Sequence, residues 1–213
     1  MARRDIAEQL KEFRTLIANS RNHSGINQAL TDFGYPLQNL EKGQALLEKF
    51  TMLHSLKSDQ YGAKLNATDT VRADLQQLKN IFNEHLTLAR LAFKEDRGLQ
   101  NTLKLNTPLP GRRSAFIEQA AHFYSKVILH HNSLKRYGVT KAELEQAQVM
   151  VTALIQSQQQ QAQKTGEAQS ATQQCNLALK ELQVWVRGYK AIVRLALGND
   201  PQLLEIVGIL VKV

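Results

Sequence analysis

Residues 141–197 read KAELEQAQVMVTALIQSQQQQAQKTGEAQSATQQCNLALKELQVWVRGYKAIVRLAL and contain no proline. Apolar or small side chains recur along them every seven residues, at Leu144, Val151, Thr172, Leu179, Val186 and Val193. Residues 37–93 also lack proline and keep the same spacing from Leu40 to Ala89. A seven-residue repeat places such side chains in one line along an α-helix. The pattern predicts two long helices of about 57 residues, each about 85 Å long at 1.5 Å per residue.

Gly62 and Gly166 lie near the middle of these stretches and leave two interpretations open. Either each long helix is continuous, or the chain turns at the glycine and a new helix begins near Thr68 and Ser170. A second apolar line within residues 141–197 keeps its register past Gly166, which favours the continuous helix.

A shift of 104 residues aligns the two long stretches and much of the sequence around them. Of the 70 positions from 30 to 99, 15 are identical to the residue 104 places later. The identities include residue types that helix-rich composition alone would not align, namely Gly34/Gly138, Gly62/Gly166 and Asp96/Asp200. We therefore predict a tandem duplication, with one helical repeat in residues 1–105, a second in 106–213, and both intertwined in one structural domain.

Shorter helices are expected on both sides of each long one. The first should cover residues 5–19 and 114–129, and the second residues 26–33 and 131–137. A last short helix should follow each long helix. The expected caps are Asp5, Gly34, Asp96, Gly138, the capping box Thr140/Glu143, and Asp200, which precedes Pro201.

The predicted fold is all-α. Both long helices are rich in leucine, valine and phenylalanine toward their ends. Near the middle, the positions where the seven-residue pattern would place apolar side chains hold polar ones instead, namely His54, Lys57, Gln158 and Gln161. A polar line buries little surface and does not suit the centre of a thick bundle. We expect an elongated bundle with pseudo-twofold symmetry, in which two long antiparallel helices are flanked at each end by shorter helices. The glutamine-rich tract 156–163 is the expected docking place for a partner helix or a second protomer.

The composition limits the class of protein. A hydrophobic content of 43% is enough for a packed core, and the formal charge of +8 makes anionic partners conceivable. Cys175 is the single cysteine, which favours a reducing compartment, the cytoplasm. The most apolar stretch, residues 203–213, is shorter than the roughly 20 residues that cross a bilayer. The N-terminus has no apolar run of the kind found in a secretory signal.

No pattern in the sequence indicates a reaction. The pairs Glu84/His85 and Glu118/His122 lack the spacing of a di-iron bundle. Cys175 occupies an apolar helix position, which indicates core packing and not a reactive thiolate. A glycine-rich phosphate loop, a G-x-S-x-G elbow and an HExxH motif are all absent from the sequence. We expect no catalytic residues, no metal ligands and no cofactor.

Basic residues supply one candidate binding site. Lys180, Arg187 and Arg194 are seven residues apart, and Lys190 lies beside them, so they form a stripe that could follow phosphates. Other basic residues that could extend the site are Arg3, Arg4, Arg112 and Arg113. The competing interpretation is a solvated helix face, because only Arg194 has a basic counterpart, Arg90, in the other repeat.

The leading hypothesis is a non-enzymatic interaction or scaffold protein that binds a protein partner or a second copy of itself through a helical surface. Its alternative is a protein that binds nucleic acid or an anionic surface through the basic stripe. A helical bundle that holds a metal or cofactor is the weaker third hypothesis.

Overall fold

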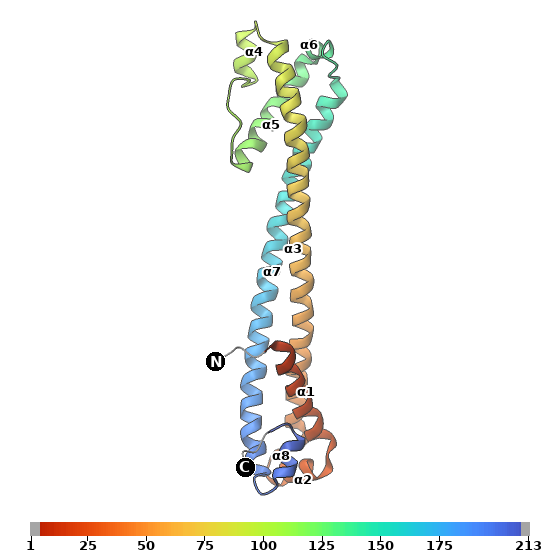
Figure 1. Ribbon diagram of the computed structural model, residues 1–213, viewed down its shortest axis with the longest axis vertical. Coiled ribbons are helices and arrows are strands. Elements are labelled where there is room, and N and C mark those ends of the chain that lie inside the picture. The colour runs from red at the N-terminus through yellow and green to blue at the C-terminus, as the bar shows by residue number, and fades with distance from the viewer. Residues whose placement is uncertain (1–4, 210–213) are drawn as a thin grey trace. The chain divides into compact units, whose positions relative to one another are not determined.

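The computed structural model describes residues 5–209, and every regular element within them is a helix (Figure 1). The elements are α1 (Ile6–Asn22), α2 (Ser24–Asp32), α3 (Leu37–Ala92), α4 (Arg97–Thr102), α5 (Arg113–Val127), the 3-10 helix η1 (Ile128–His130), α6 (His131–Lys135), α7 (Lys141–Ala196) and α8 (Pro201–Ile206). The predicted all-α class is therefore confirmed.

The two long helices, α3 and α7, are continuous and contain 56 residues each. Gly62 and Gly166 lie inside them, and a Cβ atom added at either glycine would meet no neighbour within 4 Å. The interpretation in which the chain turns near these glycines is wrong. Thr68 lies in mid-helix, where its hydroxyl donates a hydrogen bond to the carbonyl of Lys64 over 2.9 Å.

The chain divides into two compact units. Unit 1 comprises the described parts of residues 1–60 and 167–213, and unit 2 comprises residues 61–166. Unit 1 therefore contains α1, α2, α8, the first part of α3 and the last part of α7. Unit 2 contains α4, α5, η1, α6 and the remaining parts of the long helices. This division differs from the two sequence repeats, because each unit combines segments of both.

The helix boundaries follow the 104-residue offset. The helices α3 and α7 begin and end 104 residues apart, and so do α4 and α8. The backbone adopts a positive φ at Gly34 and Gly138, with values of 81° and 85°. It does so again at Lys104 and Gly208, with values of 53° and 79°. The duplication itself stays a prediction, since matching boundaries describe structure and not ancestry.

Side-chain caps begin several helices where the sequence predicts them. Asp96 accepts a hydrogen bond from the amide of Leu99, and Asp200 accepts one from that of Leu203. Thr140 and Glu143 form the expected capping box, with the Thr140 amide donating to Glu143 Oε2 over 2.7 Å. The helix α5 differs, because Arg112 precedes it without a side-chain cap.

The core of unit 1 lies where α1, α2 and α8 pack on the long helices. Phe50, Leu182 and Val193 are fully or almost fully buried in it, together with Leu16 and Ile26 from the short helices. Polar contacts also join α1 to its neighbours. Asn19 donates to the carbonyl of Ile206 over 2.6 Å, and Gln183 donates to Gln9 over 2.8 Å.

The core of unit 2 is built around Phe82, which has no exposed surface. The rings of Phe116, Phe123 and Tyr124 on α5 meet it edge to face, with centroids 5.4, 5.2 and 6.0 Å away. Edge-to-face contacts of this kind add to the free energy gained from burial. Aromatic packing between α3 and α5 therefore fixes the centre of this unit.

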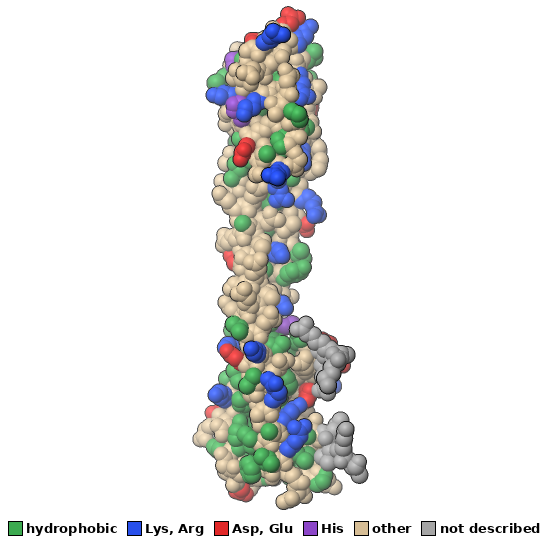
Figure 2. Space-filling model, turned by 90° about the vertical axis from the view of Figure 1, so that its left-hand side faces the viewer, with side chains coloured by type: hydrophobic (Ala, Val, Ile, Leu, Met, Phe, Trp, Pro, Cys, Tyr) green, Lys and Arg blue, Asp and Glu red, His purple; other side chains and the backbone are tan. Residues whose placement is uncertain are grey.

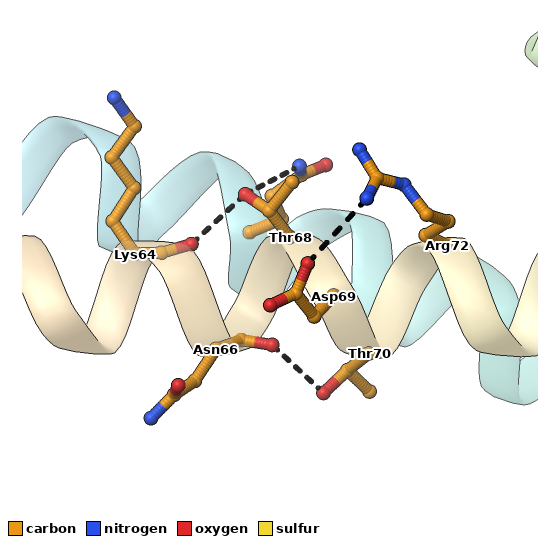
Figure 3. Close-up of polar contacts among 7 residues, drawn as sticks. Lys64, Asn66, Thr68, Asp69, Thr70 and Arg72 are labelled. Carbon is orange, nitrogen blue, oxygen red and sulfur yellow. Dashed lines mark hydrogen bonds and ion pairs between the residues drawn. The ribbon is translucent and has the colours of Figure 1, made fainter.

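Polar side chains join α3 and α7 in another part of unit 2. Gln161 donates to Thr68 Oγ1 over 3.1 Å, and Ser157 donates to Asp74 over 2.8 Å. Figure 3 shows these surroundings of Thr68, where Asp69 also forms an ion pair with Arg72 at 3.8 Å. The pairing of 68 with 161 and of 74 with 157 shows that the two helix segments run antiparallel. Within unit 2, side chains of the glutamine-rich tract therefore already contact α3.

Candidate interaction face

A line of exposed apolar side chains runs along α7 in unit 1. Leu177, Val184 and Leu195 expose 62%, 54% and 70% of their surface. At 3.6 residues per turn, these three positions fall within about 20° of one another around the helix. They lie on the side opposite the buried line that contains Leu182 and Tyr189. We refer to Leu177, Val184 and Leu195 as the apolar line.

A groove between α7 and α3 lies next to the apolar line. Its volume is about 560 Å³, and it is lined by Lys42, Leu46, Leu177, Lys180, Glu181, Val184 and Trp185. Gly43 forms part of the wall, because a Cβ atom at this position would overlap the ring of Trp185. The missing side chain therefore allows the indole to lie against the backbone of α3.

Trp185 is held by aromatic neighbours on one side. Its ring stacks on Tyr189 with centroids 4.9 Å apart and an interplanar angle of 16°. Tyr189 in turn contacts Tyr35 at 5.4 Å. Burial raises the pKa of Tyr189 to about 12 and also raises the pKa of Tyr35. Both phenols are neutral at physiological pH, so the aromatic side chains behind Trp185 add no negative charge.

Positive charge borders the apolar line on the side away from α3. Lys180, Arg187 and Arg194 are exposed and fall within about 40° of one another around α7. Figure 2 shows Lys and Arg side chains beside hydrophobic ones over the part of α7 that belongs to unit 1. We refer to these three residues as the basic line. On the opposite border, Lys49 pairs with Glu181 at 2.8 Å.

The other predicted anion-binding residues do not join this line. Lys190 forms an ion pair with Glu12 on the side of α7 that packs against α1. Arg112 and Arg113 belong to unit 2, where Arg113 donates to Gln161 over 3.4 Å. Arg3 and Arg4 lie outside the described residues. Of the four residues predicted on α7, three therefore share one exposed face.

Sequence analysis missed the apolar line and the groove. The seven-residue pattern indicates buried positions and gives no sign of which residues outside that register form an apolar surface. The one local signal is the spacing of Leu177, Val184 and Ala191, which form another seven-residue line apart from the buried positions. The contact between Trp185 and Gly43 joins positions 142 residues apart, and no local pattern reports such a pair.

Unit 2 carries polar residues at several of the positions that correspond to this face. The positions 104 residues before Lys180, Val184 and Arg187 are Gln76, Asn80 and Asn83, all exposed on α3. Positions 147 and 81, which correspond to Gly43 and Trp185, hold Ala147 and Ile81. At the positions of Leu195 and Arg194, unit 2 also has leucine and arginine, namely Leu91 and Arg90. The same helical arrangement therefore forms without counterparts of Lys180, Val184, Trp185 and Arg187. Folding alone does not account for these residues in unit 1.

The contact between Gly43 and Trp185 gives a prediction. In Gly43→Ala the new methyl group should displace the indole from α3, and the emission maximum should move to longer wavelength. Trp185 is the only tryptophan, so steady-state fluorescence of the folded protein measures this directly. Alanine is favoured over glycine in a helix by about 1 kcal/mol, which offsets lost packing, so a small change in stability is expected.

Gly62→Ala is the matched control for this change. It lies in the same helix with open space around it, and should leave the emission maximum unchanged. The double variant Gly43→Ala/Trp185→Ile should be as stable as the wild type, because it recreates the Ala147/Ile81 pair of unit 2. An unshifted emission in Gly43→Ala would contradict the described packing.

Unit 2 contains a buried polar pair that the sequence did not reveal. His85 Nδ1 lies 3.1 Å from the hydroxyl of Tyr124, and the two side chains are 7% and 0% exposed. Burial lowers the pKa of His85, although the nearby carboxylates of Glu84 and Glu143 partly oppose this. Burial raises the pKa of Tyr124. The pair is therefore neutral in the folded protein at pH 7.

His85 should make stability depend on pH. The unfolded chain takes up a proton at this histidine near pH 6.5, whereas the folded protein does so only at lower pH. Below about pH 6.5 the unfolded state therefore binds more protons, and the free energy of unfolding should fall as the pH is lowered. Denaturant unfolding at pH 7.5 and pH 5.5 should show a smaller fall for His85→Gln. The exposed His54→Gln should keep the wild-type difference.

Three further observations complete the description of residues 5–209. They include no group of three or more His, Cys, Asp or Glu side chains that could hold a metal ion. Cys175 is buried in the core of unit 1. None of their helices is both long enough and apolar enough to cross a membrane.

Comparison with protein-family models, curated proteins and solved structures finds no match.

Proposed function

We propose that this chain is a non-enzymatic helical interaction protein that binds a protein partner through the apolar line and the adjacent groove of unit 1. The exposure of Leu177, Val184 and Leu195 carries the proposal. Leu177 and Val184 also line the groove, so the apolar line is continuous with the apolar surface of Leu46 and Trp185. Contiguous exposed apolar surfaces commonly mark interaction sites. Covering these three side chains would remove apolar area from water and so favour association.

The lining of the groove supports binding more than chemistry. Among its ionised residues, Glu181 is engaged by Lys49, which leaves the ammonium groups of Lys42 and Lys180. The remaining side chains that line it are leucine, valine and tryptophan, which bury well against another helix. We place the protein in a reducing compartment, the cytoplasm, where the buried thiol of Cys175 would stay reduced.

We also propose that a tandem duplication produced the two halves. Equal helix boundaries at a 104-residue offset and the paired positive-φ positions support it. In this view one copy has uncharged polar side chains at Gln76 and Asn80, and the other has a basic and an apolar side chain at Lys180 and Val184. The interaction surface would then be a difference between the copies, built on a shared scaffold.

Site-directed photo-crosslinking in the cells that produce the protein tests the proposed function. Leu177 or Val184 is replaced with p-benzoylphenylalanine, and the control is the same replacement at Val149, a 66% exposed valine in unit 2. We expect a discrete crosslinked species from positions 177 and 184 and none from 149. No adduct from the groove, or equal adducts from all three positions, would rule the proposal out.

Binding to nucleic acid or another anionic surface is the second candidate function, and the exposed basic line is the observation that favours it. Lys180, Arg187 and Arg194 could follow a row of phosphates. A phosphate backbone would leave the neighbouring apolar line uncovered, which makes this function the less favoured one. Anisotropy titrations with labelled DNA and RNA at low salt test it. Absence of binding there would eliminate it.

A further inference from the structure

The geometry points to the chemistry of the partner: we infer that the face of unit 1 binds an amphipathic helix that carries acidic residues beside its apolar side chains. This inference rests on the proposed function and deepens it by naming the class of ligand. Two features of the face carry the inference. The first is its shape, and the second is the sign of the charge along its borders.

The shape of the face suits a helix. The groove lies between two antiparallel helix segments, as the contacts of residue 43 with 185 and of residue 49 with 181 show. Leu46 and Val184 line its two sides, and Leu177 continues the apolar surface along α7. A third helix laid along such a groove inserts side chains spaced three, four and seven residues apart. From Leu177 to Leu195 the apolar line extends about 27 Å, or roughly 18 residues of a partner helix.

The charge of the face favours an acidic partner. Residues 168–196 contain a single acidic residue, Glu181, and it is paired with Lys49. The basic line of Lys180, Arg187 and Arg194 lies beside the apolar line, and Lys42 lies on the α3 wall of the groove. An apolar helix flanked by lysines would meet like charges on both borders, whereas aspartate or glutamate at those places would be attracted.

The same charges disfavour two other occupants. A second copy that used the same face would place its basic line against an identical basic line, and like charges at an interface are unfavourable. A flat anionic membrane would attract the basic line, but it would not fill the groove between Leu46 and Trp185. Both occupants remain distinguishable outcomes of the experiment below.

The probe is a designed peptide of 21 residues with leucine at the first and fourth positions of each heptad and glutamate at the flanking positions. A scrambled peptide of equal composition keeps the charge and loses the apolar face. A third peptide has lysine in place of every glutamate. Emission of Trp185, which lines the groove and is the only tryptophan, reports occupancy.

The full-length chain should bind the acidic amphipathic peptide in a saturable way and with a shift in Trp185 emission. Binding of the scrambled and lysine peptides should be about tenfold weaker or undetectable, and binding of the acidic peptide should weaken as salt is raised. Equal binding of the acidic and scrambled peptides would mean that charge alone is recognised. Binding of the lysine peptide as tightly as the acidic one would mean that the charge is irrelevant. Either result overturns the inference.

The test variant is Lys180→Gln/Val184→Asn/Arg187→Asn, which introduces the residues that unit 2 carries at the corresponding positions. Because unit 2 accommodates them on an exposed helix face, the variant should fold normally, as circular dichroism can verify. It should bind the acidic peptide about tenfold more weakly. The matched control, Val149→Asn, alters an exposed valine of unit 2 and should leave the affinity unchanged.

Two further measurements separate the other occupants. If light scattering shows a dimer that the triple variant dissociates, the face binds a second copy. If vesicles containing phosphatidylserine bind the protein and the acidic peptide does not, the face binds a membrane surface. Either result overturns the inference. Failure of the proposed function is distinct, because in that case photo-crosslinking from positions 177 and 184 gives no adduct at all.

Discussion

Phe82→Ala is expected to lower the free energy of unfolding by about 3–5 kcal/mol, the usual effect of removing a buried aromatic ring. Phe82 has no exposed surface, and three aromatic rings of α5 surround it at centroid distances of 5.2 to 6.0 Å. Alanine would leave a cavity that rigid rings close only in part. The expected loss is a large part of the stability of a domain of ordinary size.

Urea denaturation followed by far-ultraviolet circular dichroism measures this effect. The matched control is Leu129→Ala, also in unit 2, where the leucine side chain is 73% exposed and the expected change is within about 0.5 kcal/mol. A loss below about 1 kcal/mol in Phe82→Ala would mean that these rings do not form the centre of the unit 2 core.

The length and limits of the long helices could be predicted from sequence because their causes are local. The absence of proline, the seven-residue apolar spacing and the capping box Thr140/Glu143 at the start of α7 act within one or two turns of helix. The structure begins α3 at Leu37 and ends it at Ala92, within one residue of the predicted range. Gly62 gave the one ambiguity, and the unbroken register past its counterpart Gly166 resolved it correctly.

The start of α5 and the short helices after it were less predictable. The first of these helices was expected to start at Ser114, and it begins one residue earlier, at Arg113, without a side-chain cap. The expected helix 131–137 begins at His131 as predicted, but it ends at Lys135, and the 3-10 turn η1 precedes it. Short helices obtain little stability from their own sequence, so tertiary packing decides where they begin and end.

The candidate face could be predicted only in part. The basic line followed from the spacing of Lys180, Arg187 and Arg194, since all three lie on one helix. The ion pair of Lys190 with Glu12 and the groove beside Trp185 arise between segments far apart in the chain. Sequence periodicity indicates which residues share a helix face. It does not indicate which neighbouring helix covers that face. The covering helix decides which charged and apolar side chains remain available to a partner.

The buried pair His85/Tyr124 gives the second large effect. Tyr124→Phe should leave the imidazole Nδ1 unpaired, and His85→Leu should leave the phenol unpaired, so each variant should lose about 1–3 kcal/mol of unfolding free energy. The double variant removes both polar groups from the core. It should therefore lose at least about 1 kcal/mol less than the sum of the two single losses, because neither change then leaves a buried group without its partner.

Urea denaturation at pH 7.5, where His85 is neutral, measures the unfolding free energies of the wild type, the two single variants and the double variant, which together form a double-mutant cycle. The pair Asp69→Ala and Arg72→Ala is the control, since that ion pair is exposed and should couple by less than about 1 kcal/mol. Strictly additive losses at His85 and Tyr124 would show that the two groups do not stabilise one another. An apolar pair of similar size would also fill the core beside Phe82, and a favourable coupling would explain why a polar pair is found there. The hydrogen bond fixes how α5 packs on α3. The neutral histidine supplies the pH dependence of stability expected below pH 6.5.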